Sequence, residues 1–236
     1  YLPATASYAI PHQDRITIRQ LLSHRAGVFD VGNQDIPATV DAPHAGMRYV
    51  DWVEDTRGAT HTFTLDELVD VVARHQLVNG PPGEAFRYSN TGYSLLAKMV
   101  ERVSGKSFAQ FVHDEFLMPN GLHDTSFPDD GRGQQLPAPF LEGTTRVGGT
   151  LLPTTHFNVS WGVGEGNVVT TPADLAHWFR RLVKGEAGLS AQTVAQMRAC
   201  EPTGEHHVTY GLGLTCDPAG LGIGHNGGIA GYLTTA

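Results

Sequence analysis

The most informative stretch of this chain is Pro82-Gly-Glu-Ala-Phe-Arg-Tyr-Ser-Asn-Thr-Gly-Tyr93. Its first residues predict a turn, and the residues that follow Asn90 begin a helical pattern. Tyr88-Ser89-Asn90 therefore lies on a constrained loop at the start of a helix. Such a loop can direct a phenol and an amide into a cleft, which makes Tyr88 and Asn90 candidate site residues.

A second motif, His225-Asn226-Gly227-Gly228, lies 137 positions after Tyr88. It falls on a predicted strand, where small residues allow a ligand to approach the backbone. Each motif is therefore a candidate part of a binding site.

Other catalytic patterns fail in this sequence. Gly222-Ile-Gly-His-Asn-Gly227 matches the dinucleotide fingerprint, but no helix pattern follows it, and the chain has no acidic residue about 20 positions further on. No serine lies in a G-x-S-x-G motif, which argues against an α/β-hydrolase. No His-Glu-x-x-His motif occurs, so we expect neither a metal nor a cofactor.

Composition narrows the function further. The chain has 236 residues with 40% hydrophobic residues, enough for one large domain with a real core. The net charge is −8 and no run of basic residues occurs, so a nucleic-acid partner is not expected. No apolar window reaches the length of a membrane span.

Helix signals occupy most of the chain. Thr17-Ile-Arg-Gln20 and Thr64-Leu-Asp-Glu67 predict capping boxes, and the first of these helices is expected to stop at Gly27. Leu65, Leu68, Val69 and Val72 form one apolar stripe. Further helices are predicted from about Thr91 to Ser104 with Leu96, Val100 and Val103 inward, from Ser107 to before Pro119, from Thr171 to Gly185, and near Ala191 to Ala199.

The remaining segments have the composition of loops and strands. Phe127 to Ser160 is predicted as a long loop or irregular lobe. Tyr210–Cys216, Leu221–Asn226 and Ile229–Thr235 are short, glycine-rich and partly β-branched, as expected of an antiparallel sheet. We therefore predict a single α+β domain over residues 1–236, with a mainly helical lobe over about 16–200 and sheet strands over about 208–236.

The two cysteines, Cys200 and Cys216, leave two readings open. They could form one disulfide or remain as two small buried thiols, and one pair does not identify a redox compartment.

The two motifs resemble those of the penicillin-recognising serine hydrolases related to class C β-lactamases and serine D-alanyl-D-alanine carboxypeptidases. That family joins an S-x-x-K nucleophile motif to a Y-x-N motif and a K-T-G or H-x-G motif. Ile16-Thr-Ile-Arg-Gln-Leu-Leu-Ser-His-Arg-Ala-Gly27, the Pro82–Tyr93 stretch and Gly166-Asn-Val-Val-Thr-Thr-Pro-Ala-Asp-Leu175 occur in the family's order. The resemblance implies a β-lactamase/transpeptidase-like fold, with an antiparallel sheet flanked by helices.

The resemblance also implies roles for individual residues. Tyr88 matches the family's general base, and His225 would relay protons or bind a substrate carboxylate. Asn90, Asn226 and Gly227 would bind substrate, and the backbone N–H of Gly228 would stabilise the oxyanion. Further candidates for the border of the cleft are Asn158, Trp161 and Gly164 to Gly166.

One motif of the family is missing. The only lysines are Lys98, Lys106 and Lys184, and none has a serine three positions earlier. We expect the chain to be an internal piece of a longer protein, with the nucleophile upstream and the sheet incomplete. The alternative is a homologue that has lost its nucleophile.

The expected activity is therefore that of a serine hydrolase that forms an acyl-enzyme from amides, lactams or esters. The histidine at position 225 favours a carboxypeptidase, an aminopeptidase or an esterase over an efficient β-lactamase, with a D-amino-acid peptide of the D,D-carboxypeptidase type or an ester as the expected substrate. The alternative function is a non-catalytic ligand-binding or regulatory protein that uses the same cleft. The partners would be small molecules or peptides, and the family resemblance implies a location outside the cytoplasm.

Overall fold

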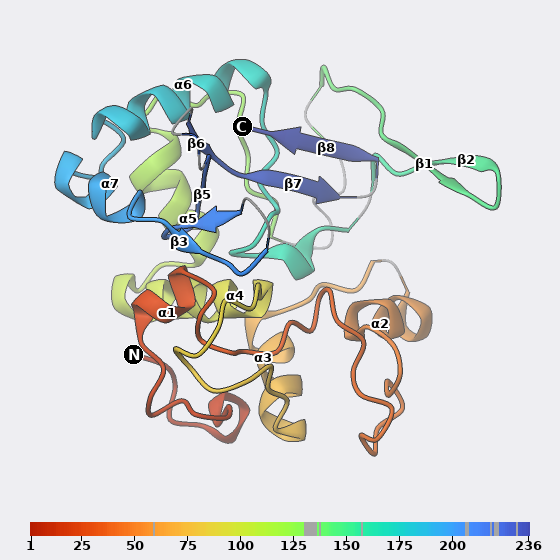
Figure 1. Cartoon of the computed structure of the whole chain (residues 1–236). Coiled ribbons are helices and arrows are strands. Elements are labelled where there is room, and N and C mark those ends of the chain that lie inside the picture. Colours follow the sequence, from red (N-terminus) through yellow and green to blue (C-terminus); the bar gives the residue numbers. More distant parts are fainter. Residues whose placement is uncertain are drawn as a thin grey trace.

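The computed structural model describes residues 1–58, 60–129, 136, 138–156, 158–205, 208–217, 219, 222–229 and 231–236. Figure 1 shows the N-terminal segments, coloured red to yellow, gathered in the lower half of the molecule, with the C-terminal strands in the upper half. The α+β class is confirmed, because the strands pair antiparallel, and α5, α6 and α7 lie beside them in the upper half of Figure 1.

The described helices include those predicted from the sequence, and α2 is a further helix that was not predicted. Short turns of helix are η1 (Ala6–Tyr8), η2 (His113–Leu117) and η3 (Ser160–Gly162). The α-helices are α1 (Ile18–Leu22), α2 (Tyr49–Arg57), α3 (Leu65–His75), α4 (Asn90–Ser104), α5 (Phe108–Val112), α6 (Pro172–Lys184) and α7 (Ala191–Met197).

The main core is built around α3. Its predicted stripe is confirmed, since Leu65, Leu68, Val69 and Val72 are all buried. Three of them pack in the largest hydrophobic cluster, together with residues of α1, α2 and the segment before α2. The core therefore supports the α1 and α4 region from below in Figure 1.

Side-chain caps fix the helix starts that the sequence predicts. Thr17 forms a complete capping box with Gln20. Thr64 accepts the N–H of Glu67, but the Glu67 carboxylate contacts Tyr49, Arg57 and His61 instead of completing the box. Ser107 caps α5 and Thr171 caps α6, as the sequence predicts.

Two helix predictions are wrong in detail. The first helix ends at Leu22 and does not continue towards Gly27, because His24 takes a left-handed φ of 53° that a helix cannot accommodate. Val103 does not face inward, since it is 70% exposed. The buried face of α4 is instead formed by Thr91, Gly92, Ser94, Leu95 and Ala97.

The strands form three small antiparallel sheets. A hairpin joins β1 (Thr144–Val147) to β2 (Thr150–Pro153). The second sheet has the order β3 (Glu201–Pro202), β4 (Thr209–Tyr210), β5 (Thr215–Cys216) and β6 (Ile223–Gly224). The third pairs β7 (Asn226–Ile229) with β8 (Tyr232–Thr235).

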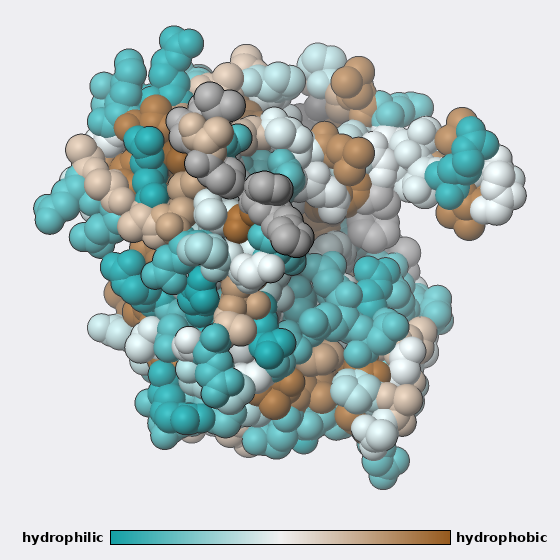
Figure 2. Space-filling model, in the orientation of Figure 1, coloured by the Kyte–Doolittle hydropathy of each residue, from teal (hydrophilic) through white to brown (hydrophobic). Residues whose placement is uncertain are grey.

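The predicted loop over 127–160 and the three predicted strands after residue 208 all differ in detail from the structure. Tyr210–Cys216 is not one strand, because the chain turns between β4 and β5 at a Gly213 of positive φ. The segment 127–160 contains the β1–β2 hairpin, which stands out from the body of the molecule in Figure 2. The predicted strand Leu221–Asn226 is divided at His225 between β6 and β7, and Ile229 ends β7 instead of starting the strand over 232–235. Residues 221 and 230 of these predictions lie outside the described ranges.

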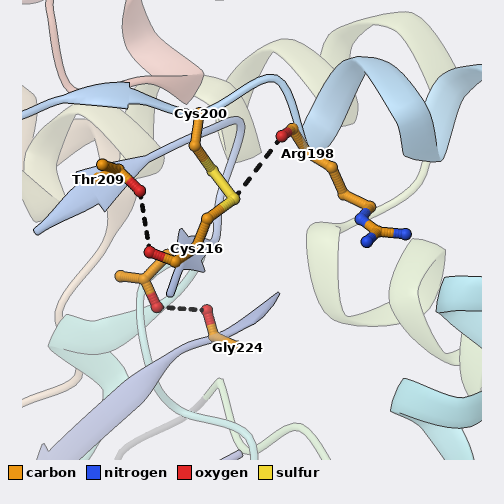
Figure 3. The surroundings of a disulfide bond; sticks show 6 residues. Arg198, Cys200, Thr209, Cys216 and Gly224 are labelled. Carbon is orange, nitrogen blue, oxygen red and sulfur yellow. Dashed lines mark hydrogen bonds between the residues drawn. A yellow bond between two sulfur atoms is a disulfide. The ribbon is translucent and has the colours of Figure 1, made fainter. Parts of the chain in front are cut away.

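A disulfide joins Cys200 to Cys216. It resolves the alternative left open by the sequence and ties β5 to the segment that follows α7 (Figure 3). Thr209 and Thr215 reinforce the same region, because their hydroxyls donate to the carbonyls of Cys216 and Gly224. Within the described residues, no helix has the length and apolar character that crossing a membrane requires.

Candidate active site

The structure brings the two sequence motifs together. The ring centroids of Tyr88 and His225 lie 6.3 Å apart. Tyr88 is 40% exposed and His225 is partly exposed, so both remain accessible from the surface. Residues separated by 137 positions therefore converge, as the sequence predicts.

The start of α4 positions the tyrosine motif. Ser89 is buried and caps the helix by accepting the N–H of Gly92 at 3.1 Å. Asn90 is the first residue of α4, and its backbone N–H donates to the Asp30 carboxylate at 3.0 Å. Tyr88 and Asn90 thus flank a cap that is anchored on both sides.

Asp30 is the anchor of this loop. It is 2% exposed, and its two carboxylate oxygens accept hydrogen bonds from the backbone of Gly32, Asn33 and Asn90 and from the side chain of Asn33. These donors satisfy a carboxylate that would otherwise be costly to bury.

The strand that carries the second motif is interrupted at His225. The backbone N–H and C=O of His225 both pair with Ala236, at 2.9 and 3.2 Å. In an antiparallel pair, a residue whose N–H and C=O both bond to the partner strand is followed by a residue whose N–H and C=O point away from that strand, and the two kinds alternate. Counting from His225, Gly227 is of the first kind and Gly228 of the second. The register places Gly228 opposite Leu233, so the Gly228 N–H points away from β8.

The other predicted substrate-binding residues lie on the same strand. Asn226, Gly227 and Gly228 are all exposed on β7. Because the Gly228 N–H points away from β8, it does not take part in strand pairing with β8, as an oxyanion donor requires.

Two members of the site were not assigned a role from the sequence. His24 stacks on Tyr88, with ring centroids 4.0 Å apart, and Tyr210 lies between His24 and His225. His24 belongs to the Ile16–Gly27 segment and Tyr210 ends β4. The sequence placed the two segments in a recognisable order, but no local pattern indicated that the side chains of His24 and Tyr210 meet.

The comparison with protein families decides the assignment. The family model described as beta-lactamase matches residues 1–236. The chain belongs to the beta-lactamase family.

Relatives and solved structures agree with this assignment. A penicillin-binding protein of Bacillus subtilis (strain 168) is 25% identical over 238 residues, which cover 95% of this chain and 48% of the relative. A D-stereospecific amidohydrolase from Streptomyces sp. has a TM-score of 0.78 at 24% identity and covers 94% of this chain and 63% of its own. The D-amino acid amidase from Ochrobactrum anthropi SV3, complexed with D-phenylalanine, has a TM-score of 0.72 at 24% identity, with 95% and 61% covered.

These comparisons also define the extent of the match. The solved structures share the β-lactamase/transpeptidase-like fold with this chain. The chain spans about half the length of the Bacillus relative.

The electrostatics of this beta-lactamase-family site oppose a phenolate at Tyr88. Burial, together with the negative charges of Asp30 and Glu165, raises the pKa of Tyr88 to about 12. The Glu165 carboxyl accepts the hydroxyl of Ser94 at 2.6 Å, and its other oxygen is buried without a hydrogen-bond partner among the described residues. Burial raises the pKa of Glu165 well above its usual value.

Cavity volume alone does not identify the site. A cavity of about 460 Å³ lies elsewhere, between α6 and β6, and is lined by Phe179, Arg180, Val183, Arg198, Gly222, Ile223 and Ala236. Neither Tyr88 nor His225 lines it, so we assign the site by the convergence of the two motifs. Over the described ranges, no three His, Cys, Asp or Glu side chains are grouped as metal ligands.

Proposed function

We propose that this chain supplies the general base, the substrate-binding strand and one oxyanion donor of a serine hydrolase that forms an acyl-enzyme. The observation that supports this proposal is the 6.3 Å approach of the Tyr88 and His225 rings, beside a strand whose Gly228 N–H points outward. The chain contains no Ser-x-x-Lys. The nucleophilic serine would come from a segment outside residues 1–236.

In the proposed reaction, Tyr88 takes the proton of the serine hydroxyl while the serine oxygen bonds to the substrate carbonyl carbon. The negative oxygen of the tetrahedral intermediate accepts the N–H of Gly228 and that of the serine. The proton then passes to the leaving amine or alcohol, and water later releases the acyl group by the same route. Asn90 would bind a substrate amide through its side chain, and Asn226 and Gly227 would line the strand beside it.

This role of Tyr88 requires a nearby cation. Burial and the carboxylates of Asp30 and Glu165 favour the protonated phenol of Tyr88, so its pKa falls towards neutrality only if positive charge lies beside it. Without such a cation, the residues of this chain keep Tyr88 protonated. The lysine of a Ser-x-x-Lys motif would supply the positive charge beside it.

The substrate proposed is a D-amino-acid amide or peptide, of the D,D-carboxypeptidase type, with esters as a second class. Support comes from the fold that the chain shares with a D-stereospecific amidohydrolase and a D-amino acid amidase. We also propose a location outside the cytoplasm, because the Cys200–Cys216 disulfide favours an oxidising compartment.

The test is kinetic and uses the protein as its gene encodes it. Tyr88→Phe should lower kcat/KM for a D-amino-acid amide by roughly 100-fold or more, the scale of lost general-base catalysis. Tyr49→Phe is the matched control, since it removes a partly buried phenol oxygen bound to Glu67 rather than one at the site. Equal activity of the Tyr88 variant and the unaltered protein would refute the proposal. A protein that binds D-amino-acid amides without turnover would instead indicate the non-catalytic alternative.

A further inference from the structure

His24, Tyr210 and His225 form a continuous hydrogen-bonded chain, which we call the histidine–tyrosine chain. The Ser89 N–H meets His24 Nδ1 at 3.1 Å, and His24 Nε2 lies 3.1 Å from Tyr210 Oη. Tyr210 Oη lies 3.1 Å from His225 Nε2, and His225 Nδ1 lies 2.6 Å from the Asn226 carbonyl oxygen. The histidine–tyrosine chain therefore connects the backbone of the tyrosine motif to the backbone of the histidine motif.

The two ends of the histidine–tyrosine chain determine where its protons lie. A neutral imidazole has one donor nitrogen and one acceptor nitrogen. The Ser89 N–H can only donate, so His24 Nδ1 accepts and His24 Nε2 carries the proton. The Asn226 carbonyl can only accept, so His225 Nδ1 carries a proton.

Tyr210 connects the two ends without conflict. Its oxygen accepts from His24 Nε2–H, and its hydroxyl proton is then available to His225 Nε2 at 3.1 Å, with the Tyr93 hydroxyl oxygen as a second neighbour. The donor at the Ser89 end and the acceptor at the Asn226 end of the histidine–tyrosine chain are both compatible with this direction. A proton on His225 Nε2 would turn the Tyr210 hydroxyl away from its acceptor.

Burial keeps the middle of the chain neutral. His24 is 3% exposed, and burial together with the nearby His225 lowers its pKa to about 3. Tyr210 is 5% exposed, and burial raises its pKa, so the hydroxyl proton is retained. His225 is the partly exposed member of the histidine–tyrosine chain, and it is the member that would face the proposed substrate.

We propose that His24 and Tyr210 are positioning residues that hold His225 as a neutral imidazole with its proton on Nδ1 and its Nε2 as an acceptor. They also fix the distance between the Tyr88-Ser89-Asn90 loop and strand β7, because the chain is bonded to both backbones. The positioning role rests on the proposed function, whereas the protonation state of the ring is a property of the folded chain itself.

The test is nitrogen-15 NMR of the histidine rings in the 236-residue chain at pH 7, with the His225 signals assigned by their loss in His225→Gln. The expected spectrum shows His225 protonated on Nδ1. A ring protonated on Nε2, or on both nitrogens, would overturn the proposal. This measurement needs neither a substrate nor a nucleophile, so it separates failure of this proposal from failure of the proposed function.

Tyr210→Phe tests the cause of the tautomer. It should shift the ratio of the two His225 tautomers towards Nε2–H by roughly tenfold, the scale of one lost hydrogen bond. Tyr232→Phe is the control, because its hydroxyl, in the strand next to β7, donates to the Leu141 carbonyl and should leave the ratio unchanged. An unchanged ratio in Tyr210→Phe, or an equal shift in the control, would contradict the positioning role.

Discussion

The carboxylate of Asp30 accepts the backbone N–H of Asn90 at 3.0 Å, and this bond fixes the loop that presents Tyr88. Asp30→Ala would leave the N–H groups of Gly32, Asn33 and Asn90 without their acceptor. We expect a loss of about 1–3 kcal/mol in the free energy of unfolding, measured by urea denaturation. The exposed Asp35→Asn is the control and should change it by less than about 0.5 kcal/mol. Similar values for the two variants would show that Asp30 is not an anchor.

The sequence predicted α4, which follows Tyr88, and most of the other helix starts because helix signals are local. Caps at Thr17, Ser107 and Thr171, together with the stripe of α3, depend on residues within one or two turns of helix. The convergence of the two motifs was predicted from the family resemblance, in which both motifs belong to one site.

The residues that the sequence did not assign act through contacts between distant segments. Tyr210 meets His24 across 186 positions, and Ser94, which had no assigned role, meets Glu165 of the Gly164–Gly166 segment across 71. No periodic pattern records such pairs. The early end of α1 depends on the left-handed conformation of His24, which is a residue type that adopts it only where tertiary contacts favour it.

Glu165 should make the stability of the chain depend on pH. Burial raises its pKa in the folded chain, so between about 4.5, the usual value, and the raised value the folded chain holds more protons than the unfolded chain. Its contribution to stability therefore falls as pH rises through that window. Glu165→Gln removes this loss, and we expect its gain in Tm over the unaltered chain to be larger at pH 8 than at pH 4.

Thermal unfolding across this pH range checks that expectation. The control is Glu84→Gln, at an exposed position, which should show no such trend. A gain in Tm that is the same at pH 4 and pH 8 in the Glu165 variant would argue against a buried carboxyl that holds its proton.

Gly27 is required where two loops meet. It has a φ of +69°, and a Cβ at this position would lie 2.0 Å from the Gly80 carbonyl oxygen. Gly27→Ala should therefore cost more than the roughly 1–2 kcal/mol of a left-handed conformation alone. Gly46→Ala separates the two effects, because Gly46 has a φ of +84° and no atom lies within 4 Å of the added Cβ. Equal losses in urea denaturation would mean that the contact with Gly80 contributes nothing.

The Cys200–Cys216 disulfide should stabilise the sheet that carries His225. The bond closes a loop with a sequence separation of 16. Replacing both cysteines by serine should lower the free energy of unfolding by about 3 kcal/mol. Dithiothreitol should lower the Tm of the unaltered chain to that of the double variant and leave the variant unchanged. A reductant effect of equal size on both proteins would contradict this role.

Covalent labelling of the encoded protein tests the location of the nucleophile most directly. Fluorophosphonate or fluorescent penicillin would be applied to the 236-residue chain and to the protein as its gene encodes it, and the modified residue would be mapped by mass spectrometry. We predict no label on the chain alone, and in the encoded protein a label on a Ser-x-x-Lys serine outside residues 1–236 that Tyr88→Phe slows by roughly 100-fold. A label on any residue within 1–236, or a labelling rate unaffected by Tyr88→Phe, would contradict the account.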